Sequence, residues 1–389
     1  MKHAFVLSYT DLVSDPRVQK QINWLIEDGW AVDTLGYGKK PHKLVNKHFQ
    51  ISPKKRNFKH KIRTLLSHLF LGNQNTYNYS VSSYLPSKDF HKRLTQNPYD
   101  FILVNDIDLL PWIQSNALEI LKANKNTLFH LDVHEFHEWT EVQGIPKIIA
   151  KRLNSYHSWI SGLIGLDLFN TRSTVAEIIA EFYANEFHIP KPIVIRNSKQ
   201  YEKLVPTSVD PNKIELVYHG NSDLTRGLGT FIESLPLLEK RFHINFMLTG
   251  TPEAIAKVKS LASNQGDRVT FHDAVPMIDV PASLNKFDLG LIYFPPVTEN
   301  FRLSLPNKFF ESIQARLGVV VGDAPSMQPY IDEYQIGVNV PGWGPEFLAT
   351  TLNSLDTAQI EKLKSNTNRC AEEVNSEADR KAMLSIANS

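Results

Sequence analysis

Short apolar runs alternate with amphipathic stretches along the first half of the chain. The apolar runs are rich in Val, Ile, Leu and Phe, which is typical of strands buried on both faces of a sheet. The amphipathic stretches repeat apolar residues every three or four positions, as helices do when one face packs on a sheet. This alternation predicts a parallel, doubly wound α/β sheet. The strands are predicted at residues 4–9, 31–35, 99–104, 127–131 and 166–170, and the helices at 17–28, 109–123, 147–161 and 174–183.

A second series of strands and helices follows a polar segment bounded by Pro190, Pro192 and Pro206, which indicates a linker. We therefore expect two facing Rossmann-like domains with a cleft between them, and ligands at the carboxyl ends of the strands. The second series has predicted strands at 214–218, 244–248, 269–271, 289–293 and 319–321, and a helix at 230–238. The expected bounds are 1–196 for the N-terminal domain, 197–212 for the linker, 213–370 for the C-terminal domain and 371–389 for a helix that packs back toward the N-terminal domain.

Residues 306–321 are predicted to form a helix and then a buried strand. Pro306 suits the first turn of the helix, and Gly318 would end it in a left-handed conformation. A helix that begins at the carboxyl edge of a sheet offers free N–H groups and a positive dipole end to a phosphate. Glu311, further along the same helix, could accept hydrogen bonds from a ribose. The alternative is a surface helix with an exposed glutamate.

This stretch resembles the nucleotide-binding helix of GT-B glycosyltransferases, in particular glycosyltransferase family 4. The family pattern has two glutamates eight positions apart, and Glu311 matches the second, which binds the donor ribose. The first, which touches the transferred sugar, falls on Leu303, so the resemblance leaves the donor sugar open. A subgroup with Pro-Asn-Lys-x-x-Glu at this place is similar to the present sequence, which adds Asn307 and Lys308 to the expected donor site.

A loop after the first strand of the second domain, residues 219–228, resembles the phosphate loop of the family. Gly220 begins the pattern, Asn221 stands at its first basic position, and Arg226 matches its second. Arg226 is the strongest candidate for the donor diphosphate, because a guanidinium satisfies two phosphate oxygens at once. Lys308 could supply a second positive charge or could lie on the solvent face. The backbone N–H groups near Ser304 and Leu305 are expected at the same diphosphate.

The first loop of the N-terminal domain, Ser14-Asp15-Pro16-Arg17, resembles the loop that borders the cleft in a subgroup of the family. Ser14, Asp15 and Arg17 are therefore candidate cleft residues. An equally good interpretation is a helix start, with Asp15 as the N-cap and Pro16 at the first helical position. The glycine fingerprint of dinucleotide-binding domains is missing here.

Residues 132–138 follow a predicted strand and contain His134 and Glu135. The spacing His-Glu-x-His is one residue short of the motif that places two imidazoles on one helical face, so a metal site is not favoured. His134 resembles the cleft histidine of the family, which lies near the donor sugar and the acceptor. The resemblance thus makes His134 a catalytic candidate and Glu135 a cleft residue. A solvent-facing histidine in a polar loop is the alternative.

Asp106 and Asp108 form an Asp-x-Asp sequence, which holds a metal diphosphate in a different glycosyltransferase fold. Both precede a predicted helix, and helix capping by Asp106 or Asp108 explains the sequence without a metal. No metal or other cofactor is expected.

The composition excludes several classes of protein. Lys plus Arg (42) nearly equals Asp plus Glu (41), which argues against a nucleic-acid-binding protein. Cys370 is the only cysteine, so no intramolecular disulfide can form, as expected in the cytoplasm. The first apolar run is too short for a signal peptide, and no run is long enough to span a membrane.

One segment departs from this balance. Residues 34–88 contain no acidic residue. A basic run that leads into an apolar helix suits an anionic membrane surface, so residues 39–71 are a candidate membrane contact, with a solvated loop and a domain-packed helix as the alternative. The basic residues are Lys39, Lys40, Lys43, Lys47, Lys54, Lys55, Arg56, Lys59, Lys61 and Arg63, and the apolar ones are Ile62, Leu65, Leu66, Leu69, Phe70 and Leu71.

The resemblance covers nearly the whole chain, with its motifs in the expected order. It implies a retaining glycosyltransferase that moves a sugar from a nucleotide-sugar donor to a saccharide or lipid-linked acceptor, in surface polysaccharide or glycolipid assembly. The N-terminal domain would bind the acceptor, and the protein would be cytoplasmic or peripheral on the inner face of the membrane. A nucleotide-sugar epimerase of the same fold and a non-catalytic nucleotide-sugar binding protein remain alternatives. A dinucleotide oxidoreductase would need the glycine fingerprint that is missing.

Overall fold

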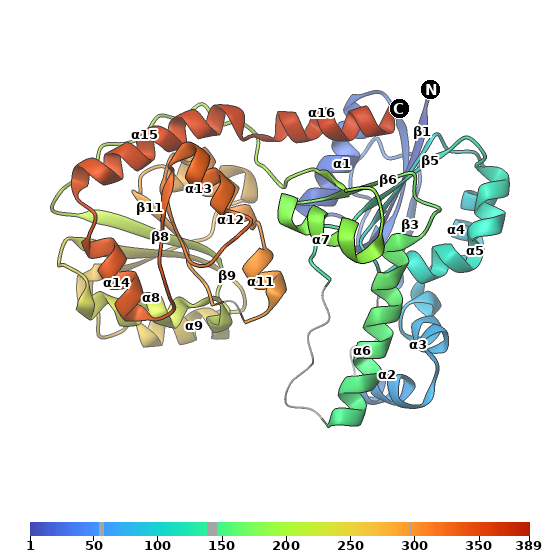
Figure 1. The fold of residues 1–389 in the computed structure, drawn as a ribbon, viewed down its shortest axis with the longest axis horizontal. Coiled ribbons are helices and arrows are strands. Elements are labelled where there is room, and N and C mark those ends of the chain that lie inside the picture. Colours follow the sequence, from blue (N-terminus) through green and yellow to red (C-terminus); the bar gives the residue numbers. More distant parts are fainter. Residues whose placement is uncertain (54–57, 138–145, 296) are drawn as a thin grey trace. The chain divides into compact units, whose positions relative to one another are not determined.

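A computed structural model of the chain describes residues 1–53, 58–137, 146–295 and 297–389 (Figure 1). The chain divides into two compact units. Unit 1 consists of Met1–Ile195 and Arg380–Ser389, and unit 2 of Arg196–Asp379. Each unit has one parallel sheet with helices against it, so the predicted pair of Rossmann-like α/β sheets is confirmed.

The sheet of unit 1 has seven parallel strands in the order β3-β2-β1-β4-β5-β6-β7. β1 lies between β2 and β4, so the winding reverses direction there, and ligands of such sheets bind at the carboxyl ends of the strands near this point. The strands are β1 (His3–Asp11), β2 (Ala31–Tyr37), β3 (His48–Gln50), β4 (Phe101–Asn105), β5 (Leu128–Asp132), β6 (Thr171–Thr174) and β7 (Ile193–Val194).

Helices cover the sheet of unit 1, and three of them, α2, α3 and α6, extend beyond its edge as a projection (Figure 1). The last residues of the chain return to this unit, because Met383, Leu384 and Ile386 of α16 are buried in the same core as Ile22 of α1. The described helices are α1 (Pro16–Glu27), α2 (Phe58–Phe70), α3 (Asn73–Ser80), α4 (Ser87–Gln96), α5 (Leu110–Ala123), α6 (Lys147–Gly162), α7 (Glu177–Phe187) and α16 (Ser376–Ala387).

Unit 2 repeats the design with six parallel strands in the order β10-β9-β8-β11-β12-β13. The winding reverses between β8 and β11. Its strands are β8 (Ile214–Asn221), β9 (Phe242–Thr249), β10 (Val269–His272), β11 (Leu289–Ile292), β12 (Gly318–Val321) and β13 (Gly337–Asn339). Its helices are α8 (Leu228–Ser234), α9 (Pro252–Leu261), α10 (Val280–Leu284), α11 (Glu299–Leu303), α12 (Asn307–Gln314), α13 (Gln328–Tyr334), α14 (Pro345–Asn353) and α15 (Thr357–Glu373).

The strand predicted at residues 166–170 is wrong. The strand is β6, which begins at Thr171 and is made of polar residues that the apolar pattern cannot recognise. Two of these side chains are buried with a hydrogen-bond partner: Arg172 donates to the Ile164 carbonyl, and Ser173 donates to Asp132. The helix predicted at 174–183 also begins later, at Glu177.

Gly318 does not end the helix that contains Glu311, contrary to the prediction. Arg316 adopts the left-handed conformation (φ 65°), and Gly318 opens β12. A glycine is required at 318 for another reason, because a Cβ there would lie 2.7 Å from a Leu289 methyl carbon.

Candidate active site

The carboxyl edge of the sheet of unit 2 brings together the loop after β8 and the start of α12. Gly220 and Gly227 have φ values of 112° and 80°, which favour glycine, so they shape the turn that carries Arg226. A Cβ at Gly220 would lie 3.9 Å from the Lys308 Nζ, so the loop and the helix are close neighbours.

Lys308 is buried at the start of α12. Its side chain is 7 % exposed, and its Nζ has no hydrogen-bond acceptor among the residues that the structure describes. The Nζ lies 3.9 Å from the centroid of the Tyr218 ring, a cation–π contact. Burial and the nearby Arg226 lower the pKa of Lys308 to about 7, although Glu311 opposes the shift. A buried ammonium without an acceptor is costly, and an arriving anion would supply what it lacks.

Arg226 ends a short 3-10 helix, Leu224–Arg226, and is half-buried. Its guanidinium lies 5.4 Å from the Phe301 ring centroid, and no carboxylate in the described part of the chain is within ion-pair distance of it. Asn221 is exposed, and its side-chain oxygen accepts from the Asp223 backbone N–H. Asn221 therefore shapes the loop, while Arg226 remains available to a ligand.

Glu311 lies on α12 and is buried between two partners. Its Oε2 accepts from His219 Nε2 at 2.8 Å, and its Oε1 accepts from Lys199 Nζ at 2.8 Å. Burial alone would raise the pKa of Glu311, but His219 and Lys199 outweigh it and lower the pKa to about 2. Burial lowers the pKa of His219, so the carboxylate is held by a neutral imidazole and an ammonium. Each oxygen keeps capacity for a further donor, as a sugar hydroxyl would require.

The start of α12 has no side-chain cap. Pro306 is the N-cap residue and provides no hydrogen bond, while the Asn307 side-chain oxygen accepts from Asn197. Ser304 precedes this turn, and its N–H donates to the Phe301 carbonyl at 3.4 Å. Leu305 is buried beside it. Of the predicted donor residues here, Lys308 and Glu311 thus lie beside the loop after β8, while Ser304 and Asn307 have partners in their own unit.

Leu303 occupies the position of the missing first glutamate. It ends α11, its side chain is 5 % exposed, and its carbonyl accepts from Ser326. A side chain buried in this way packs inside the unit and offers no hydrogen bond to a sugar.

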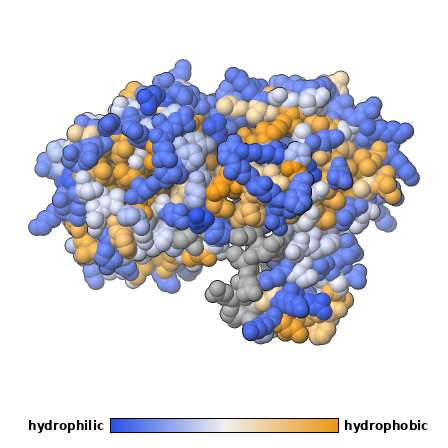
Figure 2. All heavy atoms as spheres, in the orientation of Figure 1, coloured by the Kyte–Doolittle hydropathy of each residue, from blue (hydrophilic) through white to orange (hydrophobic). Residues whose placement is uncertain are grey.

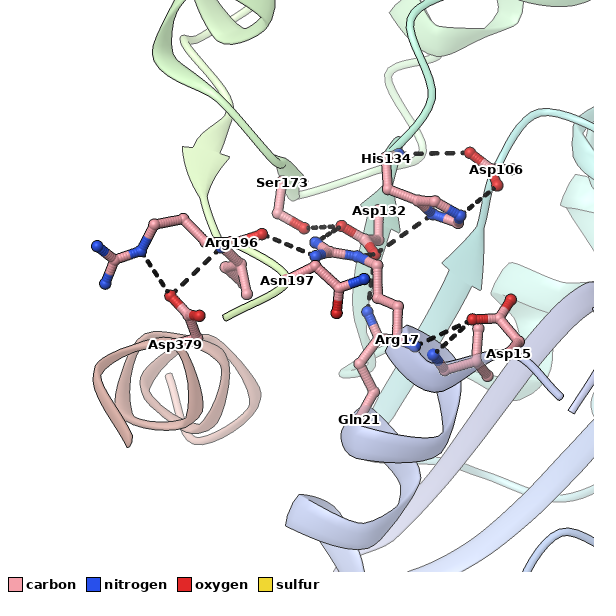
Figure 3. Close-up of polar contacts among 12 residues, drawn as sticks. Asp15, Arg17, Gln21, Asp106, Asp132, His134, Ser173, Arg196, Asn197 and Asp379 are labelled. Atoms are coloured by element: carbon pink, nitrogen blue, oxygen red, sulfur yellow. Dashed lines mark hydrogen bonds and ion pairs between the residues drawn. The ribbon is translucent and has the colours of Figure 1, made fainter. Parts of the chain in front are cut away.

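In unit 1, the carboxyl ends of β1, β4 and β5 carry the predicted cleft residues. Arg17 is buried and grips Asp132 at the end of β5, with Nε–Oδ2 and Nη2–Oδ1 distances of 2.6 and 2.7 Å (Figure 3). Gln21 and Ser173 donate to the same carboxylate. Burial raises the pKa of Asp132, but Arg17 outweighs it and the pKa falls to about 2. Arg17 therefore joins α1 to the sheet and is committed to the fold.

His134 follows β5 and pairs with Asp106, which follows β4 (Figure 3). The His134 Nε2 lies 3.0 Å from Asp106 Oδ2, and the Nδ1 lies 3.9 Å from Asp132 Oδ2. Burial alone would lower the pKa of His134, but Asp106 and Asp132 outweigh it and raise the pKa to about 9. His134 is therefore an imidazolium at neutral pH, which donates protons in hydrogen bonds and cannot act as a base.

The interpretation of Asp106 as a helix cap is wrong. Leu109 is the N-cap of α5, and Asp106 adopts a left-handed conformation (φ 58°) that turns its carboxylate toward His134 and His137. Asp15, in contrast, caps α1 by accepting from the backbone N–H groups of Arg17 and Val18.

Two further residues predicted in the cleft, Ser14 and Glu135, are also at this edge. Ser14 is exposed and donates to the Asp11 carbonyl, and Glu135 is exposed with its carbonyl accepting from Tyr183.

The sequence did not identify His219 and Lys199 as the partners of Glu311, and it did not identify Asp106 as the partner of His134. His219 stands next to Gly220, so its place at a strand end is a usable signal. Lys199 belongs to unit 2, although it lies in the segment predicted as a linker. No motif in that segment indicates a site residue. Among described residues, no group of three or more His, Cys, Asp or Glu could hold a metal ion.

Comparison with known proteins gives a match to one family. Residues 213–356 match the family of group 1 glycosyl transferases. The comparison with curated proteins gave no match.

Several solved structures share the fold along the whole chain. A glycosyltransferase from Rickettsia africae has 15 % identity and a TM-score of 0.60, with 99 % of this chain and 98 % of that chain covered. A UDP-forming α,α-trehalose-phosphate synthase from Burkholderia xenovorans has 12 % identity and a TM-score of 0.68, with 100 % and 99 % covered. HepE from Anabaena, solved with UDP, has 12 % identity and a TM-score of 0.63, with 99 % of each chain covered.

The fold is therefore GT-B, and the resemblance stated from the sequence motifs is confirmed. Residues 213–356, which match the family of group 1 glycosyl transferases, contain both the loop with Arg226 and the helix with Glu311.

Proposed function

We propose that this chain transfers a sugar with retention of configuration to an acceptor hydroxyl, in the assembly of a surface polysaccharide or a glycolipid. The main support for the donor site is the environment of Lys308. Its ammonium group is buried without a hydrogen-bond acceptor in the described residues, next to the uncapped start of α12. Such a group favours an anion, and a diphosphate is the anion that a nucleotide sugar brings.

The departing diphosphate would bind between Lys308 and Arg226. The charge that develops on the leaving phosphate in the transition state would then meet two fixed cations and the positive end of α12. Because Lys308 is already in place before the ligand arrives, little reorganisation is needed at the moment of reaction. The backbone N–H groups near Leu305 and Asn307 would add hydrogen bonds to the same oxygens.

Glu311 would hold the ribose. Its carboxylate is fixed by His219 and Lys199, so it presents oriented lone pairs to two neighbouring hydroxyls. The role of Lys199 and His219 is to keep the carboxylate ionised and in position.

His134 would act on the transferred sugar, as the family resemblance suggests. As an imidazolium held by Asp106, it would donate a hydrogen bond to a sugar or phosphate oxygen and would add positive charge. The division of labour, with acceptor binding in the N-terminal domain and donor binding in the C-terminal domain, is part of the proposal. The protein would work in the cytoplasm, at the inner face of the membrane where lipid-linked acceptors lie.

The first experiment is a thermal-shift panel with UDP, GDP and ADP, each beside its nucleoside. A raised melting temperature with one diphosphate, absent with its nucleoside, is expected. Arg226→Ala should remove most of the diphosphate effect, because a hydrogen bond to a charged group contributes about 1.5–3 kcal/mol. Arg241→Ala, which changes an arginine paired with Glu239 in the same unit, is the matched control.

The second experiment measures turnover with the nucleotide sugar of the preferred base. Diphosphate released only when an acceptor is present supports transfer, and NMR of the product then gives the anomeric configuration. Binding without release would make the chain a non-catalytic nucleotide-sugar binding protein. Conversion of the donor sugar without an acceptor would indicate an epimerase.

A further inference from the structure

The projection of unit 1, formed by α2, α3 and α6, is one packed body. The rings of His68 and Tyr156 join α2 to α6 at 4.8 Å between centroids. Asn73 at the start of α3 donates to the Ser155 carbonyl on α6, and Tyr77 meets Trp159. Side chains on α2 and on α6 therefore keep fixed positions relative to one another.

Several large apolar side chains of this projection are exposed to solvent. Phe70 is 77 % exposed at the end of α2, and Ile148 is 70 % exposed at the start of α6. A hollow of about 320 Å³ opens at the end of α2, lined by Leu66, Phe70 and Leu71 with Arg63 at its side. Figure 2 shows apolar atoms beside hydrophilic ones at the tip of the projection. Exposed large apolar side chains gathered on one projection mark a contact with another body. The exposed apolar residues are Ile62, Leu65, Leu66, Phe70, Leu71 and Ile148.

The charge of the same helices has one sign. Arg63, Lys147, Lys151 and Arg152 are exposed. No acidic residue occurs in residues 34–88 or 142–166, which include all three helices, although the whole chain carries 42 basic and 41 acidic residues. The excess is therefore local. The sequence pointed to residues 39–71, of which 54–57 lie outside the described residues; the structure adds the basic start of α6 and leaves Lys39, Lys40, Lys43 and Lys47 outside the three helices.

We propose that the face formed by α2 and the start of α6 docks on an anionic lipid bilayer, with Leu66, Phe70 and Ile148 entering the interface. A second copy of the chain would bring like charges together, because this face has no acidic residue in the described helices to pair with them. A nucleic acid or an acidic protein would match the positive charge, but it would not remove the apolar side chains of Phe70 and Ile148 from water. A bilayer with anionic headgroups matches both features.

Docking here would be peripheral. Among the described residues, no helix has the length and apolar character needed to cross a membrane. Attraction by the basic residues weakens as salt screens it, whereas apolar insertion persists, so the two contributions can be separated experimentally. The proposal does not depend on the transfer reaction and can fail or succeed independently of it.

Co-sedimentation of the full chain with vesicles tests the proposal. The vesicles contain phosphatidylcholine alone or with phosphatidylglycerol, at low and high salt. The charge variant is Lys147→Ser, Lys151→Ser and Arg152→Ser, and its control removes three exposed lysines of unit 2, Lys240→Ser, Lys257→Ser and Lys362→Ser. The apolar variant is Phe70→Ser with Ile148→Ser, and its control is Leu118→Ser, which changes a residue of α5 that is as exposed as Phe70.

The parent is expected to sediment with anionic vesicles and much less with neutral ones. The charge variant should bind anionic vesicles on the order of a hundredfold more weakly at low salt, since each basic residue contributes about 1 kcal/mol. The apolar variant should lose the fraction that survives high salt, and both controls should bind as the parent does. Each variant should keep the parent's thermal shift with nucleoside diphosphate, which shows that it is folded.

Three results would overturn the proposal. One is equal binding of the parent to neutral and anionic vesicles, or binding to neither. Another is a control variant that loses as much binding as its partner variant. The last is a dimer of the parent in solution that the apolar variant abolishes, because a second copy of the chain would then cover this face.

Discussion

The Nζ of Lys308 lies 3.9 Å from the centre of the Tyr218 ring, and no oxygen among the described residues accepts a hydrogen bond from it. The buried ammonium group of Lys308 therefore contributes little to the stability of the fold. Stability given up at one buried group is typical of a site that is completed by its ligand.

Replacing this cation should separate stability from binding. Lys308→Met keeps the length of the side chain and removes the buried charge, so we expect the free energy of unfolding to rise by about 1 kcal/mol or more. Affinity for the preferred nucleoside diphosphate should fall by about 1.5–3 kcal/mol. Chemical denaturation and titration calorimetry measure the two effects, with Lys257→Met on α9 as the control. A variant that is less stable and binds normally would contradict the assignment.

Binding of the diphosphate should take up a proton. The free Lys308 has a pKa of about 7, and a bound anion favours the charged form, so affinity should fall as pH rises above 7. Calorimetry in two buffers of different ionisation enthalpy counts the protons directly. Lys308→Met should abolish the uptake. The gain in stability of this variant should be largest at and below pH 7 and should shrink at higher pH, because the unfolded lysine binds its proton up to a higher pH than the folded one.

Asp106 should set the charge of His134. In Asp106→Asn the backbone can keep its left-handed conformation, because Asn adopts it readily, but the carboxylate is lost. The pKa of His134 should fall, so transferase activity at pH 8 should drop more than activity at pH 6. NMR titration of the His134 ring and a pH–rate profile measure this. Asp108→Asn should leave both unchanged, and Asp106→Glu should restore part of the effect.

The same pair should contribute to stability in a defined pH range. The folded pKa of His134, about 9, is above its ordinary value of 6.5, so the contribution is complete below pH 6.5 and is lost as pH rises through 9. The stability difference between the parent and Asp106→Asn should shrink over that range. A difference that is constant from pH 6 to pH 9 would mean that the pair is not ionised.

Glu311→Gln should weaken nucleotide binding by about 1–3 kcal/mol, because a ribose hydroxyl loses a charged acceptor. The folded pKa of Glu311, about 2, is below its ordinary value, so its contribution to stability is present above pH 4.5 and is lost as pH falls toward 2. Urea denaturation of parent and variant at pH 7 and pH 3.5 should show a smaller difference at the lower pH. Unchanged affinity for the nucleotide would place the ribose elsewhere.

Restoring the missing glutamate should damage the protein instead of improving it. Leu303 is buried at the end of α11, so Leu303→Glu would bury a carboxylate without a partner and should lower the free energy of unfolding by at least about 2 kcal/mol. Leu303→Met, of similar volume, is the control. A stable Leu303→Glu with higher turnover would show that the position faces the donor sugar after all.

Turnover should survive treatment with EDTA. The diphosphate charge is expected to be met by Lys308, Arg226 and the start of α12, which need no metal. Full loss of activity that manganese or magnesium restores would contradict this and would bring Asp106 and Asp108 into consideration as ligands.

Most strands of both sheets can be predicted from the sequence, because buried parallel strands are continuous apolar runs, which a one-dimensional pattern displays directly. The short strands β3, β7 and β13 are not predicted, since two or three residues are too few for such a pattern. β6 escapes that rule, since Arg172 and Ser173 are buried by virtue of partners distant in the chain. The helix with Glu311 is likewise found from local pattern and resemblance.

The partners of the site residues cannot be predicted in this way. Lys199 and Glu311 form an ion pair although more than a hundred residues separate them in the sequence, and the same is true of Arg17 and Asp132. The sequence near one residue of such a pair does not indicate which residue is its partner. Asp106 resembles a cap because it precedes a helix, yet α5 begins further on, and only the left-handed backbone reveals that its carboxylate serves His134.

Unit 1 combines residues 1–195 with residues 380–389, since Met383 and Ile386 are buried in its core and Lys2 donates to Asn388 at 2.9 Å. During synthesis, residues 380–389 leave the ribosome after all of unit 2, whose residues are contiguous. Unit 2 can therefore complete its core while unit 1 still lacks part of its own. We therefore expect unit 1, most of which is synthesised first, to complete its core last. A nascent chain halted before α16 would then present an incomplete unit 1 to chaperones and proteases.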